Sequence, residues 1–561
     1  MQYYSTLFLW TVCCFSFSQD KASAFSKPMS LPFHLAGSFG EPRPDHFHSG
    51  IDIKTNGVEG EPVFSIYDGY VSRIKVSSVG YGKAIYITHP NGYTSLYAHL
   101  GRFSDVIEKF VHGQHYAKKQ PEFDLYPDAG TFKVKQNDTI AFSGNTGGST
   151  APHLHFEIRD SKTEHALNPL DFYPKNFYTD TIPPQLNKVK LYTFNSRYYE
   201  AQTDVLPLKR SENFLTTDAP IVIDKYNFFC LSLEGFDKQD TSENKNGIYR
   251  IQMFINDTVL FGYTMNTIDF DKTRMCNAFV DYHEMMNDSG YFYNCCQLKN
   301  NTLAVYQNGN GFIRIKNKDT AEIAIHCYDY NENKTSIRLK VIRNDSEVPS
   351  DSRDMAGTIL TDKKDSIRLN GVKITFPDKC FYDDVSLKTD LWYQPDNLLA
   401  PVYSISHPGG YIPLQKSFRM EFSTVIKKQR NKVTIVRTDA DGQVTALPTK
   451  STKTRFYTES RKLGTFFLSY DTTKPEVKIL YPETERVKNK VIQVKIGDAL
   501  SGIDSYNGYI DGKWVNFYYD AKNDLMEYVI DGNCPKGEHL LKIVVTDKTG
   551  NKTTVQQKFV Y

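Results

Sequence analysis

The chain has 561 residues, too many for a single hydrophobic core, so its length predicts roughly three to five domains. Its 67 Lys and Arg residues are balanced by 65 Asp and Glu residues, giving a formal net charge of +2. Because these charges are scattered along the chain, the sequence argues against a nucleic-acid partner and against an electrostatic membrane anchor. The 37 Tyr and 36 Phe residues favour half-buried strands, so we expect a mainly β protein.

An apolar run at the N-terminus predicts export. Residues 7–17 are apolar but too few for a comfortable bilayer span, and small residues follow at the spacing that a signal peptidase needs. We therefore interpret residues 1–18 as a secretory signal peptide and place the protein in the periplasm or cell envelope. No Lys or Arg precedes the run, which departs from the usual pattern, and Cys13 or Cys14 leaves open a lipid-anchored form. No later segment resembles a transmembrane span.

Residues 25–175 are predicted to form an antiparallel β-sheet domain. Strand-like runs at 63–67 and 84–88 are bounded by turn residues at 80–82 and 90–92. This alternation of short strands and turns is typical of a compact antiparallel sheet.

Two later stretches look like copies of one another. One opens with DTIPP at Asp180 and the other with DTTKP at Asp471; each continues with a strand and closes with a hairpin-like segment. We interpret both as immunoglobulin-like β-sandwiches, the first enlarged by insertions. The predicted domain boundaries are 180–346 for the first copy, 350–470 for the β-rich stretch between the copies, and 471–561 for the second copy.

The β-rich stretch at 350–470 carries two segments, 374–377 and 407–410, that faintly resemble β-sandwich modules of surface and scaffolding proteins. We expect the three C-terminal domains to act as spacers or to dock envelope protein partners rather than to hold a second catalytic site. The cysteines beyond the signal all lie outside residues 25–175, and both disulfides and buried free thiols are consistent with their spacing.

Three short segments carry the chemistry: HSGID at 48–52, YAHL at 97–100 and HLHFE at 153–157. Side chains alternate between the two faces of a strand, so His48 and Asp52 share a face if their segment is extended, and His153 and His155 share one in theirs. Two neighbouring strands could then direct His, Asp and His toward one point.

A set of two imidazoles and one carboxylate suits zinc, and catalytic zinc sites use three protein ligands with a fourth position open for water. His99 and one histidine of the H-x-H pair would then serve proton transfer. Each segment alone is weak evidence, because His-x-x-x-Asp also occurs in surface turns and H-x-H on ordinary strands. Their conjunction, in this order and in one short β-rich exported domain, points to a metal site.

These ordered motifs resemble the lysostaphin-like (LytM-type) zinc metallopeptidases, whose signature joins H-x-x-x-D with a later H-x-H. The match extends to glycine-containing blocks between the histidine segments and covers residues 31–172, about a quarter of the chain. The further matching blocks are 37–40, 68–71, 80–82, 89–93 and 143–149.

The resemblance implies that His48, Asp52 and His155 bind Zn2+ and that His99 and His153 flank the metal-bound water, as general base and transition-state stabiliser. Zinc lowers the pKa of bound water from about 15.7 toward ~7, and a neutral imidazole with a reference pKa of ~6.5 can take up the remaining proton. Which of the two histidines takes it stays open.

Two neighbouring features are also left open. Glu157 either orients His155 or is a solvent-exposed or ion-paired side chain. The chain between His99 and Gly144 is longer than is usual for the family, and the insertion at 103–132 is expected to wall the groove, restrict substrates or cover the site.

Members of this family cut the peptide cross-links of bacterial peptidoglycan, so the resemblance implies a zinc-dependent endopeptidase that acts on peptidoglycan peptides after export. The alternative is a catalytically inactive envelope regulator, or a surface protein that uses the same domain as a peptidoglycan-binding module. The presence of all five expected site residues argues against that alternative.

Overall fold

The computed structural model describes residues 25–226, 228–240, 242–316, 318–344, 358–392, 399–482, 487 and 490–561. The signal peptide predicted at residues 1–18 lies outside this part of the chain. Strands dominate the described residues, which confirms the expected mainly β class. No helix in the described ranges is both long and apolar enough to cross a membrane.

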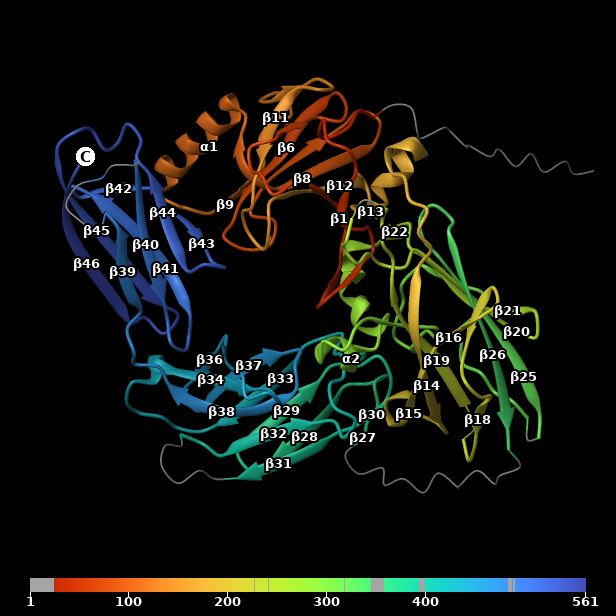
Figure 1. Cartoon of the computed structure of the whole chain (residues 1–561). Coiled ribbons are helices and arrows are strands. Elements are labelled where there is room, and N and C mark those ends of the chain that lie inside the picture. The colour runs from red at the N-terminus through yellow and green to blue at the C-terminus, as the bar shows by residue number, and fades with distance from the viewer. Residues whose placement is uncertain are drawn as a thin grey trace, which may run out of the picture.

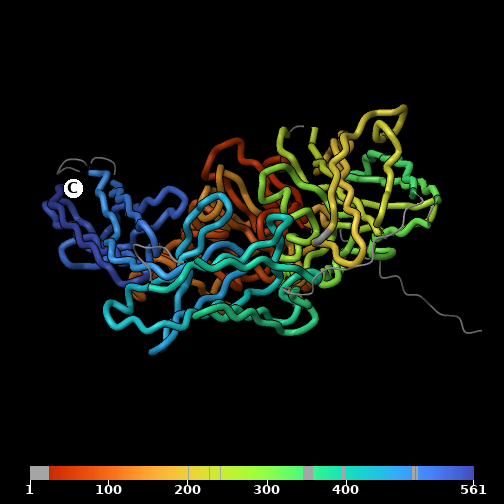
Figure 2. The backbone as a smooth tube through the Cα atoms, turned by 90° about the horizontal axis from the view of Figure 1, so that it is seen from below, coloured from red at the N-terminus to blue at the C-terminus, as the bar shows by residue number. Residues whose placement is uncertain are grey.

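Four β domains follow one another around a ring (Figure 1). The N-terminal domain, in red and orange, leads through the yellow and green domain and the cyan domain to the blue C-terminal domain, which returns to the side of helix α1 (Asp105–Lys118). In Figure 2 the ring is viewed from below, with the C-terminal domain and the second domain at opposite ends. The first and last domains are therefore neighbours in space, and the domain boundaries themselves stay predictions.

The N-terminal domain is built on a twelve-stranded sheet with an antiparallel main path. Along β7, Ile85 and Ile87 enter the main core, whereas Ala84 and Tyr86 enter a smaller cluster on the other face, as the two-residue period requires. The strands of the path, in spatial order, are β1 (Leu35–Gly37), β4 (Ile51–Lys54), β12 (His153–Asp160), β8 (Tyr93–Phe103), β7 (Lys83–Thr88), β6 (Gly69–Val76) and β10 (Lys133–Val134).

The insertion at 103–132 contains helix α1, which the sequence analysis did not predict. The helix begins after Ser104 and buries Ile107, Val111 and His115, spaced four residues apart along one face. Short strands complete the domain: β2 (Pro42–Arg43), β3 (His46–Phe47), β5 (Pro62–Phe64), β9 (Phe123–Leu125), β11 (Thr139–Ser143) and β13 (Ala166–Leu167).

The second domain packs a four-stranded sheet against an eight-stranded sheet, and its core is continuous with that of the first domain. Strand β22 (Thr267–Ile268) pairs with β13 of the first domain, so the two domains share a sheet. The four-stranded sheet comprises β15 (Gln202–Pro207), β14 (Gln185–Phe194), β19 (Phe228–Phe236) and β23 (Phe292–Asn294). The other comprises β16 (Lys209–Ser211), β17 (Phe214–Thr216), β18 (Ile221–Ile223), β20 (Arg250–Ile255), β21 (Thr258–Thr264), β24 (Tyr306–Gln307), β25 (Thr320–Tyr328) and β26 (Lys334–Arg343).

The third domain encloses its core between two five-stranded sheets. One comprises β28 (Asp365–Leu369), β29 (Val372–Phe376), β33 (Phe418–Ser423), β37 (Arg455–Ser460) and β36 (Lys450–Thr452). The other comprises β31 (Lys388–Trp392), β32 (Val402–Ser406), β38 (Gly464–Tyr470), β34 (Val433–Thr438) and β35 (Val444–Leu447).

The C-terminal domain is a sandwich of two four-stranded sheets around one core. Its closing hairpin and that of the second domain follow the repeat expected from the sequence, and both are antiparallel. The first sheet comprises β39 (Glu476–Tyr481), β40 (Val491–Gly497), β44 (Leu525–Val529) and β43 (Tyr518–Asp520). The second comprises β42 (Lys513–Val515), β41 (Ile503–Ile510), β45 (Glu538–Asp547) and β46 (Lys552–Val560).

The C-terminal domain contacts the first domain through helix α1. The Asp531 carboxylate accepts hydrogen bonds from the Tyr116 hydroxyl at 2.7 Å and contacts the His112 ring at 2.8 Å, and the Tyr116 ring meets Trp514 edge-on. Asp531 also accepts a hydrogen bond from Tyr528 of its own domain. The Asp531 carboxylate therefore links the C-terminal domain to helix α1 of the N-terminal domain.

Asp531→Ala should loosen this contact and destabilise the closed arrangement by about 1–2 kcal/mol, because it removes the hydrogen bonds that a half-buried carboxylate accepts. Hydrogen exchange of α1 should speed up while the core strands keep their protection. Asp524→Ala, on a hairpin of the same domain, is the control and should leave α1 unchanged. Unaltered exchange in Asp531→Ala would contradict the role given to this carboxylate.

Candidate metal centre

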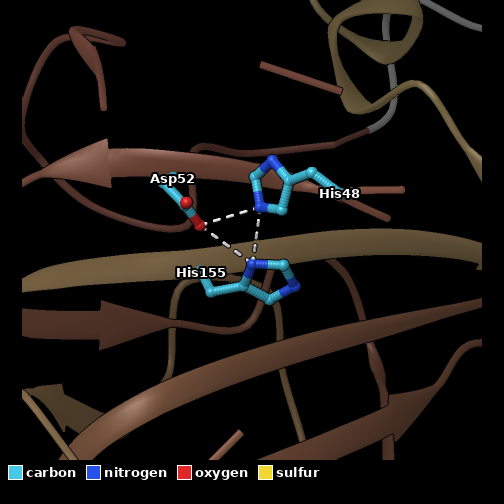
Figure 3. A group of neighbouring side chains, drawn as sticks. All are labelled: His48, Asp52 and His155. Atoms are coloured by element: carbon cyan, nitrogen blue, oxygen red, sulfur yellow. Dashed lines mark hydrogen bonds and ion pairs between the residues drawn. The ribbon is translucent and has the colours of Figure 1, made fainter. Parts of the chain in front are cut away.

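His48, Asp52 and His155 direct three donor atoms toward one another (Figure 3). His48 Nε2, Asp52 Oδ1 and His155 Nδ1 are each 2.9 Å from the other two. The three side chains are at most 6% exposed. The geometry brings together the three residues that the sequence singled out as a metal-ligand set.

The pairing of neighbouring strands positions two of these three residues. Asp52 on β4 lies directly opposite His155 on β12, and β12 also places His153 and His155 on the same face, as predicted. Strand alternation does not position His48, because residues 48–50 lie between β3 and β4 and belong to neither strand. His48 reaches the cluster from this turn, so it is the tertiary fold that aims it.

Each histidine of the cluster is oriented by a second hydrogen bond. His48 Nδ1 lies 2.8 Å from the Ser38 carbonyl oxygen, so it carries the proton and leaves Nε2 as the acceptor. His155 Nε2 lies 2.8 Å from Glu157 Oε1, so it donates there and leaves Nδ1 facing Asp52. Fixed tautomers of this kind are what metal-ligating histidines require.

Glu157 is fully buried and contacts both His155 and Arg159, so it orients His155 and is ion-paired at the same time, and only solvent exposure is excluded. Glu157 Oε2 is 2.7 Å from Arg159, and the Tyr81 and Ser49 hydroxyls donate to Oε1, the oxygen that also faces His155. Burial acts to raise the pKa of Glu157, but Arg159 and His155 outweigh it and hold the pKa well below its usual range. Burial likewise lowers the pKa of His155, yet its bonds to Asp52 and Glu157 raise it to about 9.

Arg43, which the sequence analysis did not single out, also contacts the cluster. Its guanidinium is 2.7 Å from Asp52 Oδ2, the oxygen turned away from the two histidines, and it also pairs with Glu41. Burial would raise the pKa of Asp52, but His48 and the surrounding hydrogen bonds hold it well below its usual range. Asp52 is therefore an anion that presents one oxygen to the cluster.

His99 and His153 stand beside the cluster with their rings 4.8 Å apart. His99 Nδ1 bonds to the Thr146 carbonyl at 2.8 Å, and burial together with the neighbouring His155 and His153 lowers its pKa to about 3. His99 has a left-handed backbone (φ 58°), a costly conformation that often marks functional sites. Its ring is therefore neutral near pH 7, with Nε2 as the acceptor.

His153 is fixed by its own neighbours. Its Nδ1 lies 2.8 Å from the Ala151 carbonyl and 3.1 Å from the Ser149 hydroxyl, and its Nε2 lies 3.4 Å from Asp52 Oδ1. Lys522 of the C-terminal domain donates to the carbonyl of Ser149 at 3.0 Å. The last domain of the chain thus contacts the loop that holds His153.

The donor set fits a tetrahedral metal ion. Zn–N bonds of about 2.0 Å place tetrahedral ligand atoms roughly 3.3 Å apart, so the observed 2.9 Å separations require only a small outward shift. Once His155 has given up its second proton, two imidazole nitrogens and a carboxylate oxygen make up a typical catalytic zinc set, and the negative charge of Asp52 attracts a divalent cation. His48, Asp52 and His155 are therefore the residues that could hold such an ion.

Sequence reasoning missed several supporting groups. Arg159 follows Glu157 by two residues on the same strand, so strand parity could have revealed that pair. The hydrogen bonds of His48 and His99 to the carbonyls of Ser38 and Thr146 could not be predicted, because any residue type supplies a backbone carbonyl. Tyr81 lies in a turn remote in sequence and is brought to Glu157 by the fold.

Comparison with known families agrees with this geometry. The sequence profile of peptidase family M23 matches residues 46–120 and 129–169, which contain all five predicted site residues. A second profile, that of the Zu5-like domain, matches residues 357–471.

Individual relatives match about a fifth to a quarter of the chain. The DD-carboxypeptidase/endopeptidase Mpg of Neisseria meningitidis is 37% identical over 112 residues, covering 20% of each chain. The peptidoglycan DD-endopeptidase ShyC of Vibrio cholerae is 31% identical over 99 residues, covering 18% of this chain and 17% of that protein. The catalytic domain of the M23 protein EnpA from Enterococcus faecalis is 26% identical, covering 26% of this chain and 95% of that domain, with a TM-score of 0.20.

The chain spans about a fifth of the length of the first curated relatives it matches. The similarity therefore concerns one domain and not the whole molecule. The family profile covers the segment that carries the histidine cluster. The N-terminal domain of this chain belongs to peptidase family M23, the LytM-type peptidases.

Proposed function

We propose that this chain is an exported zinc-dependent endopeptidase that cleaves the peptide cross-links of bacterial peptidoglycan. The observation that carries the proposal is the convergence of His48, Asp52 and His155, with both imidazole tautomers fixed, inside an M23 domain. The names of the relatives, which include a peptidoglycan DD-endopeptidase, support the substrate class. The other domains, with boundaries near residues 180–346, 350–470 and 471–561, would position the peptidase in the envelope or dock partners.

In this proposal His48, Asp52 and His155 hold Zn2+. When bound, zinc supplies Lewis-acid chemistry that makes water acidic enough to attack a peptide carbonyl near neutral pH. Asp52 keeps its charge because Arg43 and the histidines stabilise the anion, so the ligand set carries one negative charge.

His99 is our candidate for the general base. Its Nδ1 proton is committed to the Thr146 carbonyl, and its lowered pKa keeps Nε2 unprotonated and able to accept a proton from the attacking water. The same nitrogen can then deliver that proton to the leaving amine. His153, whose ring stands 4.8 Å from that of His99, would hydrogen-bond to the developing oxyanion.

Purified protein without the signal peptide should contain one zinc ion at the M23 site and release uncross-linked peptides from peptidoglycan. His155→Ala should lose that zinc and its cleavage, because two remaining ligands cannot hold the ion. Metal analysis and chromatography of the digest measure both properties. His165→Ala, which changes a half-exposed histidine of the same domain, is the matched control. Zinc bound without cleavage would keep the metal site but point to another substrate or a blocked groove. Neither zinc nor cleavage would refute the proposal and favour the regulatory alternative.

His99→Ala should keep zinc but reduce kcat by about 10²–10⁴-fold, the usual contribution of a general base. Comparison with His153→Ala separates the two roles. If His153→Ala lost more activity than His99→Ala and both kept zinc, the assignment of the base would be reversed.

Glu157→Gln should weaken zinc binding roughly 10–100-fold, since the charged partner of His155 is lost. It should also destabilise the domain by about 3 kcal/mol, because Arg159 stays buried without its counter-ion. Zinc titration and chemical denaturation provide the readouts. Glu164→Gln, which changes an exposed partner of Arg159, should alter neither quantity measurably. Equal effects of the two substitutions would contradict the role of Glu157.

A further inference from the structure

A cluster of three buried carboxylates lies at the start of the second domain, far from the histidine site in sequence. Asp180, Asp237 and Asp329 each bring one oxygen within 4.8 Å of the others, and the residues are only 5%, 3% and 0% exposed. Among the described ion pairs, none joins these carboxylates to a lysine, arginine or histidine. The three neighbouring carboxylates are thus buried without a basic side chain paired to them among the described residues.

Two of the oxygens in this cluster have no hydrogen-bond partner in the described part of the chain. They are Asp180 Oδ2 and Asp237 Oδ1, both buried. The second oxygen of Asp180 accepts from the Ile182 amide, and both oxygens of Asp329 accept from Asn333. Buried acceptors without donors are costly, so unpartnered oxygens at the centre of an acidic cluster point to a cation as the missing partner.

The C-terminal domain contains the same arrangement. Asp471, Asp498 and Asp547 also place one oxygen each within 4.8 Å of the others, and Asp471 and Asp547 are 2% and 1% exposed. Here too, two buried oxygens, Asp471 Oδ1 and Asp498 Oδ1, have no partner among the described atoms.

The two clusters occupy equivalent positions in the two sandwiches. Asp180 and Asp471 open their domains five residues before β14 and β39, and Asp237 and Asp498 directly follow the paired strands β19 and β40. Asp329 directly follows β25 and Asp547 is the last residue of β45, the penultimate strand of each domain, and Asn333 and Asn551 come four residues later.

The hydrogen bonds around the clusters repeat as well. Asn333 Nδ2 donates to the Asp180 carbonyl at 2.9 Å and to Asp329 at 2.6 Å. Asn551 Nδ2 donates to the Asp471 carbonyl at 3.0 Å and to Asp547 at 2.7 Å. The chain therefore builds the same oxygen-lined centre twice, from sequences that differ almost everywhere else.

We propose that each cluster binds one calcium ion, held by the three carboxylates at the point where its domain begins. Calcium takes six to eight oxygen ligands in flexible geometry, whereas magnesium demands a near-ideal octahedron and retains its water. Clusters of carboxylates and amides without nitrogen or sulfur donors suit this hard cation and not zinc. The two centres are thus chemically distinct from the histidine site.

Calcium at these positions would fix how the domains join. The first centre bonds the segment that leaves the M23 domain to the closing hairpin of the second domain. The second centre lies where the third domain meets the fourth, since the Asp471 amide donates to the Lys432 carbonyl and Lys432 Nζ donates to the Thr549 carbonyl. Filling both centres would stiffen two junctions of the ring.

A shared-proton arrangement is the competing explanation for the first cluster. Burial and the neighbouring Asp329 and Asp180 raise the pKa of Asp237 to about 9 when no ion is present, so a neutral carboxylic acid could satisfy part of the cluster. In that case Asp237→Asn would stabilise the protein, and calcium would have no effect.

The test is calcium titration of the full chain without its signal peptide, freed of metals and reloaded with zinc. Native mass spectrometry counts bound ions, and thermal denaturation with and without calcium reports stability. We expect two calcium ions in the parent and one in each of Asp237→Asn and Asp498→Asn. The double variant should bind none and should lose the calcium-dependent rise in Tm. Asp204→Asn and Asp504→Asn, which change exposed acids of the same domains, are controls and should bind two.

The proposal is overturned if the folded parent binds no calcium at millimolar concentration, if the double variant binds as many ions as the parent, or if magnesium raises Tm as much as calcium. If Asp237→Asn does not fold, Asp180→Asn serves for the same centre. His155→Ala should still bind two calcium ions, so this test is independent of the proposed peptidase activity.

Discussion

The register between β4 and β12 is the constraint on which the candidate site depends. It sets Asp52 opposite His155, and the pairing of β12 with β8 sets His155 beside Ala98, one residue before His99. Because side chains alternate along a strand, a slip of one residue would turn His153, His155 and Glu157 to the opposite face together. The buried Glu157–Arg159 pair works against such a slip, since a slipped strand would have to bury or solvate both charges elsewhere.

The neighbouring domains reinforce this register. Gln239 of the second domain accepts from the Leu35 amide and donates to the Phe33 carbonyl, and Ser242 donates to the Leu35 carbonyl, which fixes the β1 edge beside β4. From the other side of the ring, Lys522 contacts the loop beside His153. The M23 domain is thus contacted by both of its neighbours in space, and the surroundings of the histidine cluster include parts of the chain far apart in sequence.

Much of the architecture follows from local sequence pattern. Alternating apolar residues and turn residues make the strand at 84–88 and the closing hairpins of the two sandwiches recognisable in the sequence. The aspartates at 180 and 471 are recognisable because similar segments surround them. Helix α1 escaped prediction, since its buried face consists of only a few residues, one of them His115, and its other positions are polar. The pairing of β13 with β22 could not be anticipated either, because such short strands are defined by their partner.

The sequence by itself determined the mainly β class, the order of the motifs and the identity of His48, Asp52, His99, His153 and His155 as the chemical set, because residue type and spacing record which donors are available. Only the tertiary structure decided how those donors meet: that His48 comes from a loop, that backbone carbonyls fix three imidazoles, and that the buried Glu157–Arg159 pair holds the fourth, His155. These features depend on hydrogen bonds between residues distant in the chain, and a carbonyl group leaves no mark in the sequence. The closure of the ring is of the same kind, since it depends on the contact between Tyr116 and Asp531, which are 415 residues apart in the chain.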